Sequence, residues 1–359
     1  MKIGKYEIKH PIIQGGMGVG ISWDQLAGNV SLEGGLGVIS AVGTGYYKNK
    51  SENIHIVTKK DKPKDVANFY NRESLFEIVA NARKICGDLP LACNILYAIN
   101  DYGRVVRDAC EAGINIIITG AGIPTNMPEF TKDFPDVALI PIVSSARALK
   151  LICKKWQRYG KLPDAVIVEG PLSGGHQGFT YEQCSQEEYQ LENIVTPVIE
   201  EAKEWGNFPI IAAGGVWDKN DIDKFIALGC AGVQMATRFI GTFECDADAK
   251  FKNVLLNAKA EDIQLMKSPV GLPARGVMTN LQFSIENKTA PKVQCISNCV
   301  APCNRGHEAK LVGYCIADRL GAAYNGDVET GLFFSGSNGY RIEKIISVKE
   351  LMEKLTVGE

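Results

Sequence analysis

The clearest candidate for catalysis is His176, which lies in the run Gly174-Gly175-His176-Gln177-Gly178 just after an apolar segment. A histidine whose pKa is near neutrality can remove a proton or hydrogen-bond a developing anion. The glycines around it let the backbone approach a ligand closely. A loop histidine that only fixes a turn is the alternative interpretation. The other histidines do not follow the end of a predicted strand: His10, His55 and His307.

Two short segments further along the chain have the composition of a phosphate site. Gly214-Gly215 leaves backbone N–H groups uncovered, and Gln234-Met235-Ala236-Thr237 adds further N–H groups and a hydroxyl. Backbone donors of this kind bind phosphate without a lysine, and Arg238 follows them. Tight packing of a helix on a strand would explain the same glycines. No complete G-x-G-x-x-G motif occurs, so a Rossmann dinucleotide site is not supported.

Four of the eleven cysteines lie close together in the sequence: Cys295, Cys299, Cys303 and Cys315. Four thiolates in one loop can hold an iron–sulfur cluster, or less readily zinc, whose ribbons use a tighter C-x₂-C spacing. Reduced, partly buried thiols are the alternative, because free cysteine packs as a small hydrophobe. Both interpretations stay open, and no metal ligands are assigned.

Eight short apolar segments must position these residues. Most are continuous apolar runs, which are typical of strands buried on both faces of a parallel sheet. Helix-like segments lie between them, and Asp218 is placed to cap one. Eight strand–helix units predict an α/β fold, a closed (β/α)₈ TIM barrel, with a doubly wound open sheet as the competing architecture. The predicted strands are residues 11–14, 36–40, 90–96, 115–119, 137–143, 165–169, 209–213 and 232–237, and the predicted helices include 74–86, 101–112, 144–159 and 218–228.

The residues at the ends of all eight predicted strands are small, polar or glycine-rich. In a barrel these ends meet at one face, where active sites lie. A single glycine there is more often required by a turn, but eight such ends together predict a flat ligand lying on exposed backbone. Two longer connections, near residues 44–71 and 171–193, are expected to be insertions on this face.

The pattern changes after residue 250. Residues 250–266 look helical, 267–310 show little periodicity, and 312–324 and 348–355 look like further helices. We expect a barrel over residues 1–250. We expect residues 251–359 to form a cap and cysteine-rich C-terminal region packed on the barrel mouth.

The composition excludes several classes of protein. The chain is 45% hydrophobic and 22% charged, with a formal charge of −2 at pH 7, which is ordinary for a globular protein and gives no argument for nucleic-acid binding. No apolar run is long enough for a membrane span, and the N-terminus lacks the pattern of a signal peptide. Eleven cysteines without an export signal predict mostly reduced thiols and a cytoplasmic location.

Taken together, the motifs resemble the nitronate monooxygenase (2-nitropropane dioxygenase) family, which includes the flavin-dependent enoyl-acyl-carrier-protein reductase II enzymes. The resemblance extends to about residue 245, whereas the cysteine cluster and the stretch GLFFSGSNGYRIEKI at 331–345 depart from the best-known members. The residues that carry it are PIIQGGM at 11–17, the strand with Asn94, Glu169-Gly170 followed by GGHQG, IAAGGV at 211–216 and VQMATRF at 233–239.

The resemblance implies a TIM-barrel flavoprotein with non-covalent FMN and His176 as the catalytic residue. By position, Gly16 and Met17 would lie along the isoalloxazine, and Glu169 stands where a family glutamine contacts the cofactor. Ala236 stands where many members have glycine. The implied cofactor-binding residues are Gly15, Gly16, Met17, Asn94, Glu169, Gly174, Gly214, Gly215, Gln234, Met235, Ala236 and Thr237.

The resemblance also implies a choice between two reactions on one site. In a nitronate monooxygenase, the substrate anion reduces the flavin and O₂ completes the oxidation, and His176 would deprotonate a neutral nitroalkane or bind its nitro oxygens. In the enoyl reductase, NADH or NADPH supplies hydride to FMN, which reduces an enoyl thioester. We favour the first reaction and keep the second as the alternative. A flavin- or metal-binding redox sensor is a third hypothesis, and a homodimer is compatible with each.

Overall fold

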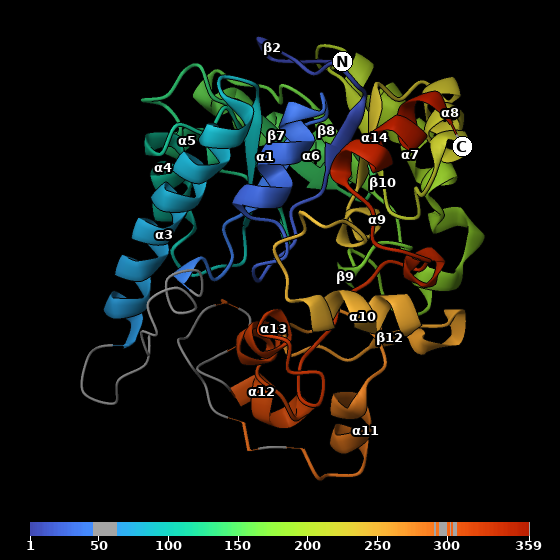
Figure 1. The fold of residues 1–359 in the computed structure, drawn as a ribbon. Coiled ribbons are helices and arrows are strands. Elements are labelled where there is room, and N and C mark those ends of the chain that lie inside the picture. The colour runs from blue at the N-terminus through green and yellow to red at the C-terminus, as the bar shows by residue number, and fades with distance from the viewer. Residues whose placement is uncertain (46–62, 291, 294–299, 302, 304–306, 359) are drawn as a thin grey trace.

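Eight parallel strands form a barrel in the upper part of the molecule as drawn in Figure 1. The structure is a computed structural model that describes residues 1–45, 63–290, 292–293, 300–301, 303 and 307–358. The strands lie in the spatial order β3-β11-β10-β8-β7-β6-β5-β4. Their bounds are β3 (Ile12–Gln14), β4 (Gly37–Ser40), β5 (Leu91–Leu96), β6 (Ile116–Gly120), β7 (Ala138–Val143), β8 (Val166–Glu169), β10 (Ile210–Ala213) and β11 (Gly232–Met235).

Backbone hydrogen bonds close the barrel between β3 and β4. The Leu36 N–H donates to the Ile12 carbonyl at 2.9 Å, and the Gln14 N–H donates to the Leu36 carbonyl at 3.0 Å. The predicted TIM barrel is therefore confirmed, and the open-sheet alternative is wrong. The last strand is shorter than predicted. It ends at Met235 because the next residue leaves the extended conformation, and Thr237 begins a short helix.

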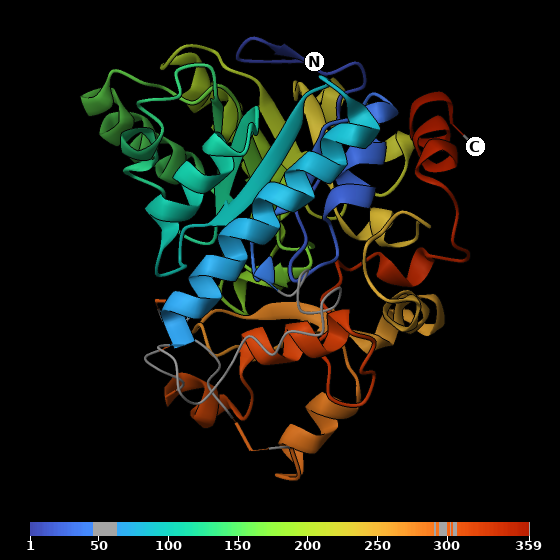
Figure 2. The ribbon, with the colours of Figure 1, turned by 60° about the vertical axis from the view of Figure 1, so that its left-hand side comes forward.

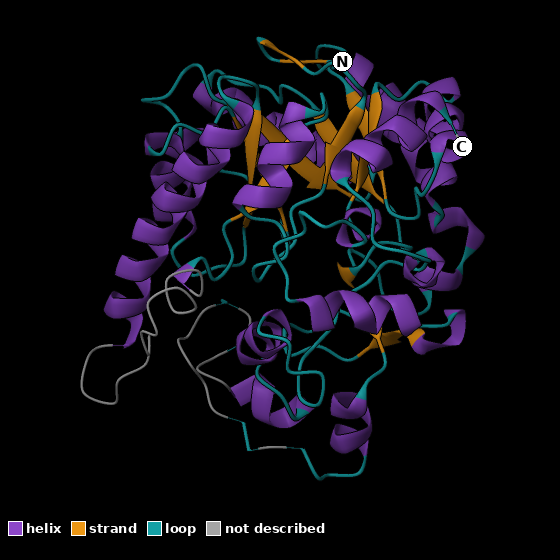
Figure 3. Cartoon of the chain, in the orientation of Figure 1, coloured by secondary structure: helices purple, strands orange, loops and turns teal. Residues whose placement is uncertain are grey.

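Helices surround the barrel, as Figure 3 shows. Asp218 caps α8 as predicted, since its carboxylate accepts from the N–H groups of Asn220 and Asp221 at 3.0 and 3.2 Å. None of the helices in the described ranges combines the length and hydropathy that a bilayer-crossing segment needs. The surrounding helices are α1 (Asp24–Leu32), α3 (Pro63–Cys86), α4 (Tyr102–Glu111), α5 (Met127–Phe130), α6 (Ala146–Trp156), α7 (Leu191–Lys203), α8 (Lys219–Ala227) and α9 (Thr237–Ile240).

Alternation along each strand sorts the side chains between the barrel interior and the helix layer. On β8, Ile167 packs in an inner cluster, whereas Val166 and Val168 pack in the outer cluster with the helices. Both faces are apolar, which explains the continuous apolar runs of the sequence. Because successive side chains alternate, Glu169 follows Ile167 onto the inner side at the end of the strand.

The C-terminal region lies against the open end of the barrel (Figures 1 and 2). It joins the barrel through a small antiparallel sheet, in which Ala274 pairs with His176. The sheet contains β9 (Gly175–His176), β12 (Ile263–Met266) and β13 (Ala274–Val277), and the helices of this region are α10 (Ala249–Asn257), α11 (Asn280–Glu286), α12 (His307–Val312) and α13 (Ile316–Tyr324). The last helix, α14 (Val348–Val357), returns to the barrel and packs against α1 and α8.

The helix predicted over residues 250–266 is wrong in its second half. The helix α10 ends at Asn257, and residues from Ile263 form β12, whose backbone pairs with β13. The apolar spacing of this segment fits both the helical and the strand period, and antiparallel pairing with the next strand, β13, decides for the strand. The predictions for 312–324 and 348–355 correspond to α13 and α14.

Asp246 holds the first turn of α1 from a distant position in the chain. Its carboxylate accepts hydrogen bonds from the N–H groups of Trp23 at 2.7 Å, Gln25 at 3.1 Å and Leu26 at 3.2 Å. Burial raises the pKa of Asp246 to about 7, although these donors act in the opposite direction. The carboxylate thus replaces the missing side-chain cap of α1.

We expect Asp246→Ala to lower the free energy of unfolding by about 2 kcal/mol, because three N–H groups lose their acceptor. Urea unfolding of both proteins measures the difference. Asp246→Asn keeps one acceptor oxygen and should lose less. Equal losses for the two variants would contradict the capping role.

Candidate active site

A cavity of about 990 Å³ opens at the C-terminal ends of the barrel strands. Its volume is in the range of small-molecule sites. The fold brings every residue that the sequence analysis singled out for catalysis or cofactor contact to this one cavity. These are Gly15, Gly16, Met17, Asn94, Glu169, Gly174, His176, Gly214, Gly215, Gln234, Met235, Ala236 and Thr237.

The loop after β3 lies against the end of β5. A Cβ at Gly16 would be 2.4 Å from the Cβ of Asn94, so only glycine lets the two segments approach this closely. Gln14 fixes the start of the loop, because its Oε1 accepts from the Val38 N–H at 3.0 Å. The loop therefore presents backbone to the cavity beside the Asn94 amide.

The turn after β10 consists of two glycines in the left-handed region. Gly214 and Gly215 both have φ of +95°, which residues with a side chain rarely adopt. A Cβ at Gly214 would be 2.7 Å from the carbonyl oxygen of Gly170. Consequently, the chain segments that follow β8 and β10 approach each other through backbone atoms at Gly214, whereas the side chain of Leu172 lies beside Gly215.

Gln234 offers an unused acceptor beside this turn. Its Oε1 is buried and has no hydrogen-bond partner in the part of the chain that the structure describes. A buried acceptor normally has a partner, so the amide fits a ligand that donates a hydrogen bond. Thr237 behaves differently, because its Oγ1 already accepts from the Gly336 N–H at 2.8 Å.

Phe334 and residues 336–338 complete the cavity, and the sequence analysis did not predict them as site residues. Asn338 Nδ2 donates to the Gly215 carbonyl at 2.7 Å. A Cβ at Gly174 would be 2.7 Å from the Gly336 nitrogen, so these two segments also meet through backbone. The run of small and polar residues at 335–338 was the available signal. The sequence analysis did not use this run, because it lies far in sequence from the end of every predicted strand.

His176 enters the cavity from β9 and is held by the C-terminal region. Its Nε2 lies 2.7 Å from Ser268 Oγ, and its ring packs edge-on against Phe334 with centroids 5.4 Å apart. Burial lowers the pKa of His176 to about 4, so the imidazole is uncharged at neutral pH. A group this weakly basic is better suited to hydrogen bonding than to proton removal. Nothing in the sequence around Ser268 indicated its part in the site.

Glu169 is a second titratable residue of this cavity whose pKa is strongly shifted. It ends β8 on the inner side and lines the cavity. Burial raises the pKa of Glu169 to about 7. Burial therefore shifts the pKa values of Glu169 and His176 in opposite directions.

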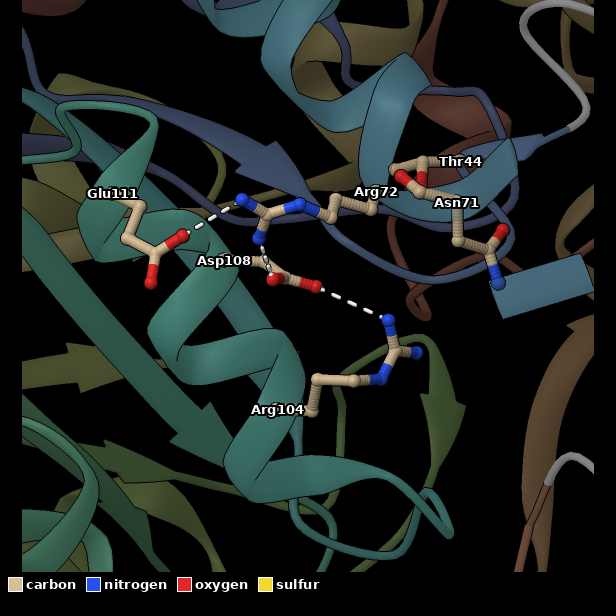
Figure 4. A network of polar contacts seen from close by, with 6 residues as sticks. All are labelled: Thr44, Asn71, Arg72, Arg104, Asp108 and Glu111. Carbon is tan, nitrogen blue, oxygen red and sulfur yellow. Dashed lines mark hydrogen bonds and ion pairs between the residues drawn. The ribbon is translucent and has the colours of Figure 1, made fainter. Parts of the chain in front are cut away.

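Ion pairs join α3 and α4 at the rim of the cavity, as Figure 4 shows. The buried carboxylate of Asp108 pairs with Arg72 and, at 3.2 Å, with Arg104. Arg72 also pairs with Glu111 at 2.8 Å. The network links α3 to α4. Its two arginines and two carboxylates balance in charge, so it adds no net charge to the rim.

The nine cysteines in the described ranges are free thiols. Cys295 and Cys299 lie outside those ranges, whereas Cys303 is half-buried and Cys315 is buried. No group of three or more potential metal ligands occurs among the described residues. The iron–sulfur hypothesis therefore stays a prediction.

Known proteins share both this fold and this sequence pattern. The sequence model for nitronate monooxygenase matches residues 1–358. A probable nitronate monooxygenase of Staphylococcus saprophyticus is 28% identical over 287 residues, which cover 76% of this chain and 77% of the relative. A (3aS,4S,5R,7aS)-5-hydroxy-7a-methyl-1-oxo-octahydro-1H-indene-4-carboxyl-CoA dehydrogenase of Rhodococcus jostii is 27% identical, with 78% and 66% covered. The structure of FabK from Thermotoga maritima has a TM-score of 0.69 and 27% identity, with 98% and 93% covered.

The family match spans the barrel and the C-terminal region. The departure noted at 331–345 therefore lies inside the family's range, and the resemblance inferred from the strand-end motifs is confirmed. The chain belongs to the nitronate monooxygenase family, a family of flavin-dependent oxidoreductases.

Proposed function

We propose that the protein is an FMN-dependent nitronate monooxygenase that oxidises alkyl nitronates with O₂. The observation that carries the proposal is the convergence of His176 and the twelve cofactor-contact candidates on one cavity. The family match and the Staphylococcus saprophyticus relative support the same activity.

The cavity has features that fit FMN. The orphaned Oε1 of Gln234 offers an acceptor to a ligand donor, and Gly214 and Gly215 line the cavity with backbone that carries no side chain. In this proposal, one group of residues holds the flavin ring: Gly15, Gly16, Met17, Asn94 and Glu169. A second group holds the ribityl and phosphate end: Gly174, Gly214, Gly215, Gln234, Met235, Ala236 and Thr237. When bound, FMN supplies the electron transfer between substrate and O₂.

His176 then orients the substrate. An uncharged imidazole held by Ser268 can hydrogen-bond the oxygens of a nitronate without repelling or protonating it. Val270, Leu272 and Phe334 line the same cavity from the C-terminal region and offer an apolar surface to the carbon chain of the substrate.

The alternative is the NAD(P)H-dependent reduction of an enoyl thioester on the same FMN site. The Rhodococcus jostii relative, whose name describes a CoA-linked substrate, favours it. So does the apolar lining of the cavity, which includes Ile99, Val105, Ile316 and Leu320 and suits a longer hydrophobic chain. A flavin- or metal-dependent redox sensor is the third hypothesis.

Three further parts of the proposal concern organisation. We propose that residues 1–250 are the FMN-binding barrel and residues 251–359 its cap. We propose a cytoplasmic enzyme whose partner is a small-molecule substrate, with neither nucleic acid nor membrane as a partner. A homodimer is compatible with this arrangement.

The purified protein is expected to be yellow and to release FMN, not FAD, on denaturation, because the proposed phosphate site takes a single phosphate and the sequence has no Rossmann fingerprint for an adenosine half. Under anaerobic conditions, propionate 3-nitronate should bleach the flavin, whereas NADH and NADPH should not. A colourless protein that takes up no FMN contradicts the cofactor. Bleaching by NADH or NADPH but not by the nitronate selects the enoyl reductase instead.

A further inference from the structure

We propose that residues 335–341 form a clasp over the phosphate end of the cofactor site, which slows the release of FMN and makes the site select FMN over riboflavin. None of these residues is among the cofactor-contact candidates of the sequence analysis. This role rests on the proposed function, because FMN is the ligand that the clasp retains. It makes the C-terminal region responsible for positioning the hydrogen-bond donors that meet the phosphate.

Two neighbouring residues of the clasp hold two different barrel loops. The Ser337 N–H donates to the Leu172 carbonyl at 3.0 Å, in the segment between β8 and β9. Asn338 Nδ2 donates to the Gly215 carbonyl at 2.7 Å, in the turn after β10. Gly215 has a φ of +95°, a conformation that glycine permits but does not enforce. The bond from Asn338 therefore fixes a turn that its own residues leave free to move.

A third loop, at the start of α9, carries a hydroxyl whose direction the clasp decides. Thr237 Oγ1 accepts from the Gly336 N–H at 2.8 Å, and both residues line the cavity. A hydroxyl has one proton to donate, and the Thr237 hydroxyl donates to no group among the described residues. Its proton is left for an anion in the cavity. A phosphate oxygen accepts such a proton more strongly than the terminal hydroxyl of riboflavin does.

The far end of the clasp is anchored at Arg341. Its Nη2 pairs with Asp218 at 3.1 Å, and its guanidinium lies 5.3 Å from the centre of the Trp217 ring. The guanidinium of Arg238 lies 4.6 Å from the centre of the same ring, so two cations stack on one indole. Trp217 and Asp218 follow the Gly214-Gly215 turn directly. The clasp thus holds this segment at both of its ends.

The charges around the cavity explain why the position of these donors matters. Within the described ranges, the lysine or arginine residues that line the cavity are Arg72 and Arg104 at the rim, and both pair with Asp108. The three loops and the clasp line the phosphate end with neutral donors. Neutral donors hold an anion only when several point at it together. Loss of the clasp is therefore expected to weaken the binding of the phosphate in particular.

The test compares Asn338→Leu with wild type, because leucine keeps the size of the side chain and removes the donor to the turn. In the holoenzyme, the rate of FMN release is expected to rise at least about tenfold. The recovery of flavin fluorescence after dilution measures this rate. In the apoprotein, the Kd for FMN should rise by a similar factor, whereas the Kd for riboflavin should change less than about threefold.

Asn280→Leu is the matched control. Asn280 also lies in the C-terminal region, and its Nδ2 donates to Glu329 Oε2 at the same distance of 2.7 Å. Neither residue of this pair lines the cavity. The control should keep FMN release and both Kd values within about twofold of wild type. If it loses FMN as fast as Asn338→Leu does, the C-terminal region acts only through its general stability, and the clasp is overturned.

Hydrogen exchange of the wild-type protein keeps the test decisive if Asn338→Leu does not fold. By linkage, a ligand whose binding the clasp favours must in turn stabilise the clasp. FMN should therefore slow the exchange of the amides of residues 335–341 relative to the apoprotein, and riboflavin should slow it less. Equal protection by the two flavins overturns the clasp.

The outcomes separate the clasp from the proposed function. Wild-type apoprotein that binds neither FMN nor riboflavin contradicts the cofactor of the proposed function and, with it, the clasp. If wild type binds FMN but Asn338→Leu releases it at the wild-type rate, the proposed function stands and the clasp is overturned. The same conclusion follows if Asn338→Leu loses affinity for FMN and riboflavin equally.

Discussion

His176→Asn is expected to lower kcat/KM for a preformed alkyl nitronate by about 10²-fold, which is typical for the loss of one hydrogen bond to a developing or bound anion. The FMN content should be unchanged, because the imidazole is held by Ser268 and Phe334 rather than by the glycine turns. The loss should be similar for neutral nitroethane. Burial lowers the pKa of His176 to about 4, so an uncharged imidazole meets both substrates and can hydrogen-bond the nitro oxygens of each.

Steady-state kinetics with both substrates, together with the absorbance of bound flavin, measure this result. Ser268→Ala is the graded comparison, because it keeps the imidazole and removes the hydroxyl 2.7 Å from Nε2. It should lower kcat/KM less than His176→Asn does. Activity within threefold of wild type in His176→Asn would show that the histidine only supports the packing of β9 against β13.

The barrel and most of the site could be predicted because both depend on local patterns. The run from Ile116 to Gly120 is apolar on both faces, as expected for a parallel strand that is covered on both sides, and in this barrel the helices cover one side and the barrel interior the other. Parallel strands also bring their C-terminal ends to one face. The glycine turn at Gly214-Gly215 therefore lines the same cavity as His176, although Gly214 follows His176 by 38 positions in sequence.

The remaining site residues could not be predicted, because contacts between distant segments place them. Ser268 and Phe334 reach His176 only after the chain pairs β13 with β9. Asn338 reaches Gly215 through a loop with no apolar period. The charge state of His176 was equally hidden, because it depends on burial by this region. The sequence suggested a histidine whose pKa is near neutrality. In the folded chain, burial lowers the pKa of His176 to about 4, so its imidazole is uncharged and only weakly basic.

Gly214→Ala is expected to raise the Kd for FMN at least about tenfold, equivalent to about 1.4 kcal/mol. Two effects act together at this position. A φ of +95° is unfavourable for alanine, by roughly 1–2 kcal/mol. The new Cβ would also lie 2.7 Å from the Gly170 carbonyl oxygen, a backbone atom that cannot rotate away. The turn must shift, and the shift moves the wall that faces the Gln234 amide. Titration of apoprotein with FMN, followed by the quenching of flavin fluorescence, gives the Kd.

Gly229→Ala separates strain from ligand binding. Gly229 has a φ of +99°, and its nearest neighbour to a new Cβ is Ile199 Cδ1 at 3.5 Å, so alanine adds backbone strain without a clash. Gly229 does not line the cavity. Both variants should lose stability in urea, but only Gly214→Ala should lose affinity for FMN. An equal rise in Kd in both variants would mean that the loss follows global destabilisation. Unchanged affinity in Gly214→Ala would mean that FMN does not bind against this turn.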